Sequence, residues 1–230
     1  MPYKLITQYK YITANISLTI CFFLIFIINT GMIQKSTSSD FEGTINLTKQ
    51  TLYDTTFYSF IVKNNLVRID EKTNKNNIIQ SIIIDVSSKS ITALSPSQKL
   101  YTNIYKNRIY PYNDVKITKT EEFKYINGFK CTLWRVKNFN FNTEVSLWLS
   151  YTNFNFFSQV TELLSKTEDY SQLCSYFNLI PQNSGYFPIL IVERTLLREE
   201  KSRMLVTSVQ HHIVNSNLFK IPRDYRCLVN

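Results

Sequence analysis

Apolar and polar residues alternate along most of the chain beyond residue 40, and the alternation has the period of a β-strand. The clearest segment is 143–150, in which Val145, Leu147 and Leu149 alternate with Glu144, Ser146 and Trp148. Successive side chains of a strand point to opposite faces, so this segment predicts a strand with two different faces. Segment 127–137 precedes it across the short loop 138–142, and together they predict a central β-hairpin.

Similar segments on both sides of this hairpin predict a series of strands. Turn-forming residues separate them, as at Asn64-Asn65, Ser95-Pro96-Ser97 and Asn127-Gly128. The other predicted strands are 41–48, 57–63, 66–70, 78–85, 91–94, 99–105, 115–125, 187–198 and 203–214. Strands joined in this way indicate an antiparallel meander, which curls because the strand twist accumulates.

Segment 153–180 interrupts the strands with apolar residues at helical spacing. They fall in two groups before Pro181, namely Phe156, Phe157, Val160, Leu163 and Leu164, then Leu173, Tyr176, Phe177 and Ile180. Two short helices with one apolar face each would form a lid on the concave side of the curled sheet. The predicted fold class is therefore mainly β (α+β), a curved antiparallel half-barrel of about nine to eleven strands with a short helical lid.

The first residues have the pattern of an export signal. Lys4 and Lys10 precede the apolar stretch 16–28, which the polar pair Asn29-Thr30 follows. Counted from 11 to 33, the segment is also long enough to span a bilayer. We expect residues 1–36 to be a signal peptide or an N-terminal membrane anchor, and 37–230 to be the half-barrel domain with its helical insert 153–180.

Composition and charge narrow the class of partner. The chain has 15 Tyr and 16 Phe, and aromatic residues favour sheets. Its net charge of +9 would attract anionic surfaces such as lipid headgroups or nucleic acid, although a solvated basic surface with no dedicated partner is the simpler interpretation. The basic residues are scattered and form no recognised nucleic-acid module, so we expect no nucleic-acid partner.

Catalytic and metal-binding patterns are missing from the sequence. His211 and His212 are adjacent in a predicted strand, so their side chains point to opposite faces. No nucleophile elbow or phosphate-binding glycine loop occurs. We therefore expect no enzyme activity, no cofactor and no metal. Of the cysteines beyond the export segment, Cys131, Cys174 and Cys227, at most one pair can form a disulfide.

Short motifs in a fixed order carry a family resemblance. They are Phe41-x-Gly43, Ile84-Asp85, Pro96-x-x-Lys99-x-Tyr101, Gly128-Phe-Lys-Cys131, Trp148, Phe187-Pro188, and Phe219-x-Ile-Pro222 with Tyr225. This order resembles an uncharacterised family of exported bacterial envelope proteins, which is similar in fold to the LolA-like superfamily of lipoprotein carriers and periplasmic sensors. The resemblance implies a half-barrel fold with a helical lid and a hydrophobic cavity. It also implies a protein of the periplasm or cell envelope, without enzyme activity.

Two hypotheses for function follow. In the first, the domain binds a hydrophobic ligand under the lid, a lipid or the acyl chain of a lipoprotein, because burial of apolar chain needs few polar contacts. The candidate cavity or lid residues are Val145, Leu147, Phe156, Phe157, Val160 and Leu164. In the second, a solid core supports a surface that docks to another envelope protein or senses it. Membrane association through 11–33 would accompany either function if the segment is kept.

Overall fold

The structure is a computed structural model that describes residues 41–104, 114–165, 167 and 172–228. The chain divides into the units Met1–Ser39 and Asp40–Asn230, and the described residues all belong to the second. The predicted export segment therefore lies outside the described residues. Within the described ranges, no helix has both the length and the apolar character needed to cross a membrane.

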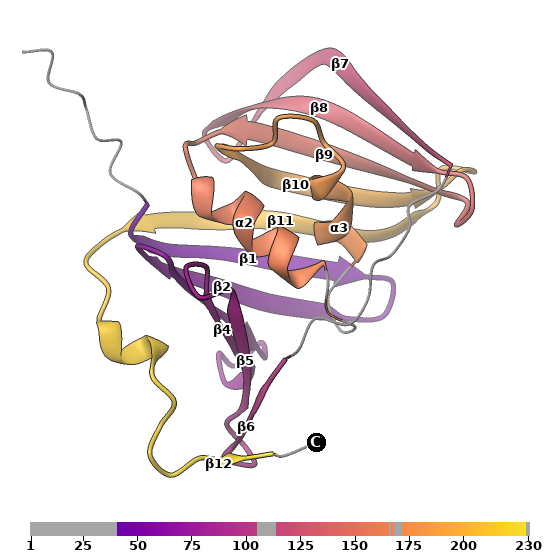
Figure 1. Cartoon of the computed structure of the whole chain (residues 1–230). Helices are drawn as coiled ribbons and strands as arrows, with labels where there is room; N and C mark the ends of the chain where they lie inside the picture. The colour runs from indigo at the N-terminus through magenta and orange to yellow at the C-terminus, as the bar shows by residue number, and fades with distance from the viewer. Residues whose placement is uncertain (1–40, 105–113, 166, 168–171, 229–230) are drawn as a thin grey trace, which may run out of the picture. The chain divides into compact units, whose positions relative to one another are not determined.

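Strands dominate the described part of the chain, with two α-helices and one 3-10 helix (Figure 1). In chain order the elements are β1 (Gly43–Thr51), β2 (Thr55–Lys63), β3 (Leu66–Lys72), β4 (Ile78–Asp85), β5 (Ser90–Ser95), β6 (Leu100–Asn103), β7 (Val115–Ile126), β8 (Phe129–Asn138), β9 (Thr143–Tyr151), α2 (Asn155–Leu164), α3 (Gln172–Asn178), β10 (Tyr186–Thr195), β11 (Glu200–His211), η1 (Ser216–Phe219) and β12 (Arg226–Cys227).

All of these strands belong to one curved, open sheet, in the order β12-β6-β5-β4-β3-β2-β1-β11-β10-β9-β8-β7. Two antiparallel meanders meet where β1 pairs with β11, which brings Gly43 opposite His211. The predicted fold class, a curved antiparallel sheet with a helical lid, is confirmed. The strand number needs a small correction: the sheet has 12 strands, and the last of them, β12, runs parallel to β6.

Hairpin turns fix the register of the sheet. Asn64 and Asn127 adopt positive φ angles of 53° and 48°, which asparagine tolerates better than most residues. Gly128 follows with a φ of 84°, so Asn127-Gly128 is the tight turn that the sequence predicts between β7 and β8. With the register fixed, alternate residues of each strand face the concave side.

The two helices pack on the concave face over β9 and β10 (Figure 1). A buried face of α2, which includes Phe156, Val160 and Leu164, points toward the sheet. The rings of Phe157 and Phe187 meet edge to face at 4.5 Å, and those of Phe157 and Phe177 at 4.9 Å. One hydrophobic core therefore joins the sheet, α2 and α3.

The C-terminal segment is held on the sheet by polar contacts. Arg68 donates from Nη1 to the carbonyl of Leu218 at 2.8 Å, and its Nε lies 2.7 Å from the carboxylate of Asp70. Lys99 Nζ pairs with Asp224 at 3.0 Å, just before β12. The contacts of Arg68 with Leu218 and of Lys99 with Asp224 connect residues far apart in the sequence, which explains why a local pattern did not predict β12.

Candidate functional site

A cavity of about 170 Å³ lies on the concave face beside α2. Six strands and one helix supply its walls, so it depends on the assembled fold. The lining residues are Leu47, Lys49, Tyr58, Phe60, Ile69, Glu71, Gln80, Ile82, Phe157, Phe187, Pro188, Ile191 and Met204.

The register of the sheet brings the lining residues into neighbouring rows. Leu47 of β1 lies opposite Tyr58 of β2, which lies opposite Glu71 of β3. Glu71 in turn pairs with Gln80 of β4. Because each pair shares a face of the sheet, alternate positions on four consecutive strands reach one space.

Apolar groups form the floor and roof of the cavity, whereas polar groups gather at one side. Leu47, Phe60, Ile69 and Ile82 are buried in the floor, and Phe157 is buried above them in α2. The polar lining residues Lys49, Glu71 and Gln80 are partly or largely exposed to solvent. We call these three residues the mouth. The arrangement suits a ligand with an apolar part inside and a polar group outside.

The size of the cavity limits what it can hold. An engineered cavity of about 150 Å³ lined by apolar side chains binds benzene, a molecule of six carbons. A volume of about 170 Å³ is therefore enough for about six carbon atoms. Typical small-molecule pockets are larger, roughly 300–1,000 Å³. In this conformation of the protein, the cavity therefore has room for a short apolar group only.

The structure places the six predicted site residues in one core, and one of them in the cavity lining. Phe157 lines the cavity. The others are buried in the same core cluster beside it: Val145, Leu147, Phe156, Val160 and Leu164. Sequence reasoning did not single out Leu47, Phe60, Ile69 and Ile82. Their alternation marked them as inward-facing strand residues, but it carried no signal of unfilled space next to them.

The histidines and cysteines make structural contacts. His211 packs against the ring of Phe41 at 4.9 Å, and His212 Nε2 lies 2.9 Å from Thr44 Oγ1. Cys131 and Cys227 carry free thiols, and burial raises the pKa of Cys131 to about 11. Within the described ranges, no three His, Cys, Asp or Glu side chains come together as a metal site would require.

Several solved structures are similar to this chain at low sequence identity. An uncharacterized conserved protein from Thermus thermophilus is 9% identical, with a TM-score of 0.46, over 81% of this chain and 90% of that one. A chain of the MucA/MucB complex from Pseudomonas aeruginosa is 7% identical, with a TM-score of 0.47 over 81% of this chain. The similarity covers 58% of the Pseudomonas chain, less than two thirds of its length.

A putative outer membrane lipoprotein-sorting protein domain from Vibrio parahaemolyticus is also similar. It is 6% identical, with a TM-score of 0.32, over 77% of this chain and 87% of that one. No curated protein matches the chain. A family model described as "Domain of unknown function (DUF4412)" matches residues 41–225, and this match confirms the family resemblance seen in the sequence.

Proposed function

The chain belongs to the DUF4412 family, and from that premise we propose that it is a non-enzymatic, exported envelope protein that binds the end of an acyl chain beneath its helical lid. The acyl chain would belong to a lipid or a lipoprotein. The observation that carries the proposal is the cavity, because it is walled by buried apolar side chains and has a polar mouth.

The energetics of burial support a short apolar ligand. Each CH₂ group removed from water contributes about 0.8 kcal/mol, so about six carbons contribute roughly 5 kcal/mol before the cost of ordering the ligand. That cost is of similar size, so a chain of this length alone would bind weakly. Contacts between its polar head and Lys49 or Gln80 at the mouth would add affinity.

A longer acyl chain needs more space than the cavity offers, and the lid is the element that could provide it. The contacts of α2 and α3 with β9 and β10 come from side chains, whereas the strands of the sheet also share backbone hydrogen bonds. If the lid lifts, the space extends toward Val145 and Leu147 of β9. These two residues, with Phe156, Val160 and Leu164 of α2, stay predicted ligand contacts.

The test is a chain-length series in isothermal titration calorimetry, from butyrate through hexanoate and octanoate to decanoate. With the lid closed, affinity should rise about fourfold with each added carbon until about six are buried, and then level off. Leu47→Trp places a large ring in the cavity and should abolish binding. Leu52→Trp is the matched control, because Leu52 lies in an exposed turn outside the cavity.

A steady rise in affinity to the longest chain, equal in both variants, would show binding at another surface. Absence of binding at any length in a folded protein would contradict the proposal itself. A melting curve for each variant keeps these outcomes apart from a failure to fold.

The alternative is a protein-interaction or sensor module of the envelope, and the size of the cavity favours it as a second candidate. A volume of about 170 Å³ also suits one apolar side chain of a partner protein. Crosslinking in intact cells followed by purification would recover such a partner in stoichiometric amount. Loss of that partner in Leu47→Trp, without any response to the carboxylates, would favour this function over lipid binding.

A further inference from the structure

Hairpin turns of an antiparallel sheet alternate between its two ends. Thr51 at the end of β1 lies opposite Ser202 near the start of β11, and Thr195 at the end of β10 lies opposite Thr143 at the start of β9. The turns 52–54, 139–142 and 196–199 therefore lie at one end of the sheet. We call it the apolar end, for the reason given next.

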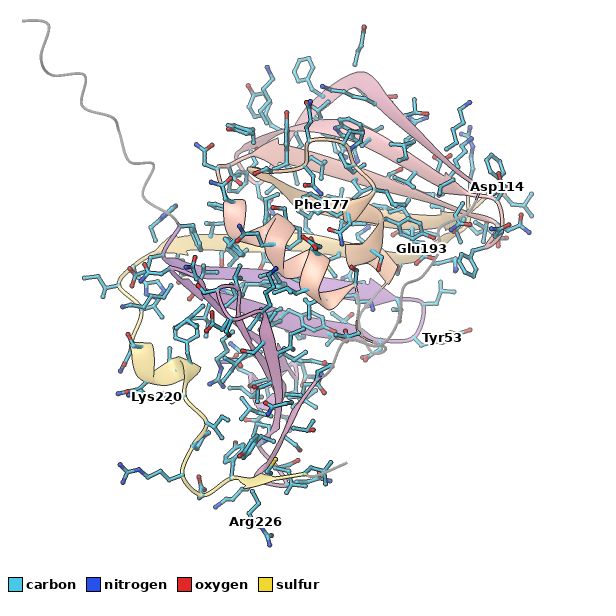
Figure 2. The ribbon with its side chains drawn as sticks, viewed as in Figure 1. Tyr53, Asp114, Phe177, Glu193, Lys220 and Arg226 are labelled. Carbon is cyan, nitrogen blue, oxygen red and sulfur yellow. The ribbon has the colours of Figure 1, made fainter. Side chains whose placement is uncertain are left out.

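Large apolar side chains occupy these turns and are exposed there. Tyr53 is 96% exposed, Leu197 86%, Leu52 72% and Phe141 56%. Phe139 and Leu196 are exposed in the same turns. Figure 2 shows Tyr53 projecting away from the sheet. Turn positions are normally taken by glycine, proline or polar residues, so apolar residues in three turns need an explanation.

The opposite end of the sheet provides an internal comparison. Its turns are Asn64-Asn65, 86–89 and Asn127-Gly128. None of these three turns exposes a large apolar side chain. Two more turns at the apolar end, 73–77 and 96–99, are polar as well. The large apolar side chains therefore gather in the three turns that belong to the neighbouring strands β2-β1-β11-β10-β9-β8. The polar turns show that chain reversal in this sheet does not require exposed apolar side chains.

Hydrogen bonds hold the apolar turns in place. The amide of Thr51 donates to the carbonyl of Asp54 at 2.8 Å, and the amide of Arg198 donates to the carbonyl of Thr195 at 2.9 Å. Neighbouring turns are also linked, because the amide of Leu196 donates to the carbonyl of Asn142 at 3.1 Å. The apolar side chains are therefore presented on a fixed scaffold, which lowers the entropy lost on binding.

The arrangement of the turns indicates what they bind. Five strand spacings of about 4.8 Å separate the outermost strands of these hairpins, so the exposed side chains extend along roughly 25 Å. A protein partner would need a separate pit for each protruding turn. The interface of a bilayer accepts each side chain individually, and aromatic rings such as those of Tyr53, Phe139 and Phe141 suit it.

Charge favours an anionic membrane. The chain carries a net charge of +9. At the apolar end itself the charges are nearly balanced. Arg198 has Glu199 beside it, Asp54 lies in another of the turns, and Lys137 and Lys201 pair with Glu144 at 3.2 Å and Glu193 at 2.9 Å. The attraction to anionic lipid therefore comes from the net charge of the whole chain, and the apolar turns supply the contact.

We infer that the apolar end docks on the surface of an anionic lipid bilayer through Leu52, Tyr53, Phe139, Phe141, Leu196 and Leu197. This membrane contact is a function separate from ligand binding, and it does not require the cavity to be filled. The two sites are nevertheless close, because Lys49 at the mouth is two residues from the end of β1. Docking would bring the mouth near the lipid headgroups.

Hydrogen exchange of the full chain, with and without vesicles of phosphatidylcholine and phosphatidylglycerol, tests this inference. Exchange should slow in the turns 52–54, 139–142 and 196–199, and it should not change at Asn64-Asn65 or Asn127-Gly128. The localised readout separates docking of this end from any contribution of residues 11–33 to vesicle binding. Vesicles of phosphatidylcholine alone should give less protection.

The variant Leu52→Ser with Leu197→Ser should lower the affinity of the apolar end for vesicles at least tenfold and remove the protection. Ile213→Ser is the matched control, because Ile213 is 90% exposed and lies outside these turns. All three positions are exposed, so the variants should fold, and their melting temperatures check this. Unchanged exchange in the three turns would overturn the inference. So would protection of those turns by self-association or a protein partner in the absence of lipid.

Discussion

Replacing Phe157 with alanine should both destabilise the domain and enlarge the cavity. Its ring is 4% exposed and contacts the rings of Phe177 and Phe187 at 4.9 Å and 4.5 Å between centroids. It also lies 6.3 Å from the ring of Phe60 in the cavity floor. The side chain therefore belongs both to the packing between lid and sheet and to the site.

The magnitude follows from burial. Truncation of a buried phenylalanine to alanine costs about 3–5 kcal/mol, which includes the lost ring contacts. A domain of this size should then melt about 6–20 °C lower. Because the ring lines the cavity, its removal also adds space comparable with that of the engineered benzene site. The plateau of the chain-length series should move to longer carboxylates.

Urea denaturation measures the first effect and calorimetry with the carboxylate series measures the second. Phe177→Ala is the matched control, because Phe177 is 0% exposed and does not line the cavity. It should lose similar stability and keep the plateau at about six carbons. If Phe157→Ala lowers the free energy of unfolding by less than about 1 kcal/mol, the described packing of the lid is refuted. If the affinity of Phe157→Ala levels off at the same chain length as that of the parent, the proposed position of the ligand beside Phe157 is refuted.

Three further predictions concern the rest of the sheet. Asp70→Ala leaves the guanidinium of Arg68 without its 2.7 Å partner and should cost about 3–5 kcal/mol in urea denaturation; a loss under about 1 kcal/mol would contradict the role of this ion pair. Because burial raises the pKa of Cys131 from 9.0 to about 11, the folded thiol keeps a proton that the unfolded chain releases. Stability should therefore fall as pH rises from about 9 to about 11, and Cys131→Ser should remove that slope. Gly43 has a φ of 152° and a Cβ there would lie 2.0 Å from the carbonyl oxygen of Gln210, so Gly43→Ala should lower stability by at least about 2 kcal/mol; a melting temperature equal to that of the parent would contradict this.

Much of the fold could be predicted because its signals are local. The strand from Ile78 to Asp85 has the predicted bounds, and the turns at Asn64-Asn65 and Asn127-Gly128 lie where the sequence places them. Asparagine and glycine mark such turns through their tolerance of positive φ, and alternation marks the strands between them. Local signals of this kind can be identified in the sequence without knowledge of the tertiary structure.

Other features depend on contacts between distant residues. β12 is a pair of residues, too short for any periodic pattern, and Lys99 and Asp224 help to fix it beside β6. The cavity depends on how closely Phe157 approaches strands β1 to β4, which periodicity does not report. The apolar pairs Leu52-Tyr53 and Leu196-Leu197 are visible in the sequence, but the second pair lies within the predicted strand 187–198, whereas β10 ends at Thr195. Only the register of the sheet shows that they share one end.

The central claim, an apolar chain held between α2 and the sheet, is tested most directly by crystals of the protein grown with 6-bromohexanoate. The bromine should give an anomalous peak inside the cavity, among Phe157, Ile69 and Ile82, with the carboxylate toward Lys49. The same crystal of Leu47→Trp should show no peak there. An empty cavity in the parent protein at saturating ligand, or a bromine bound only at another surface, would contradict the claim.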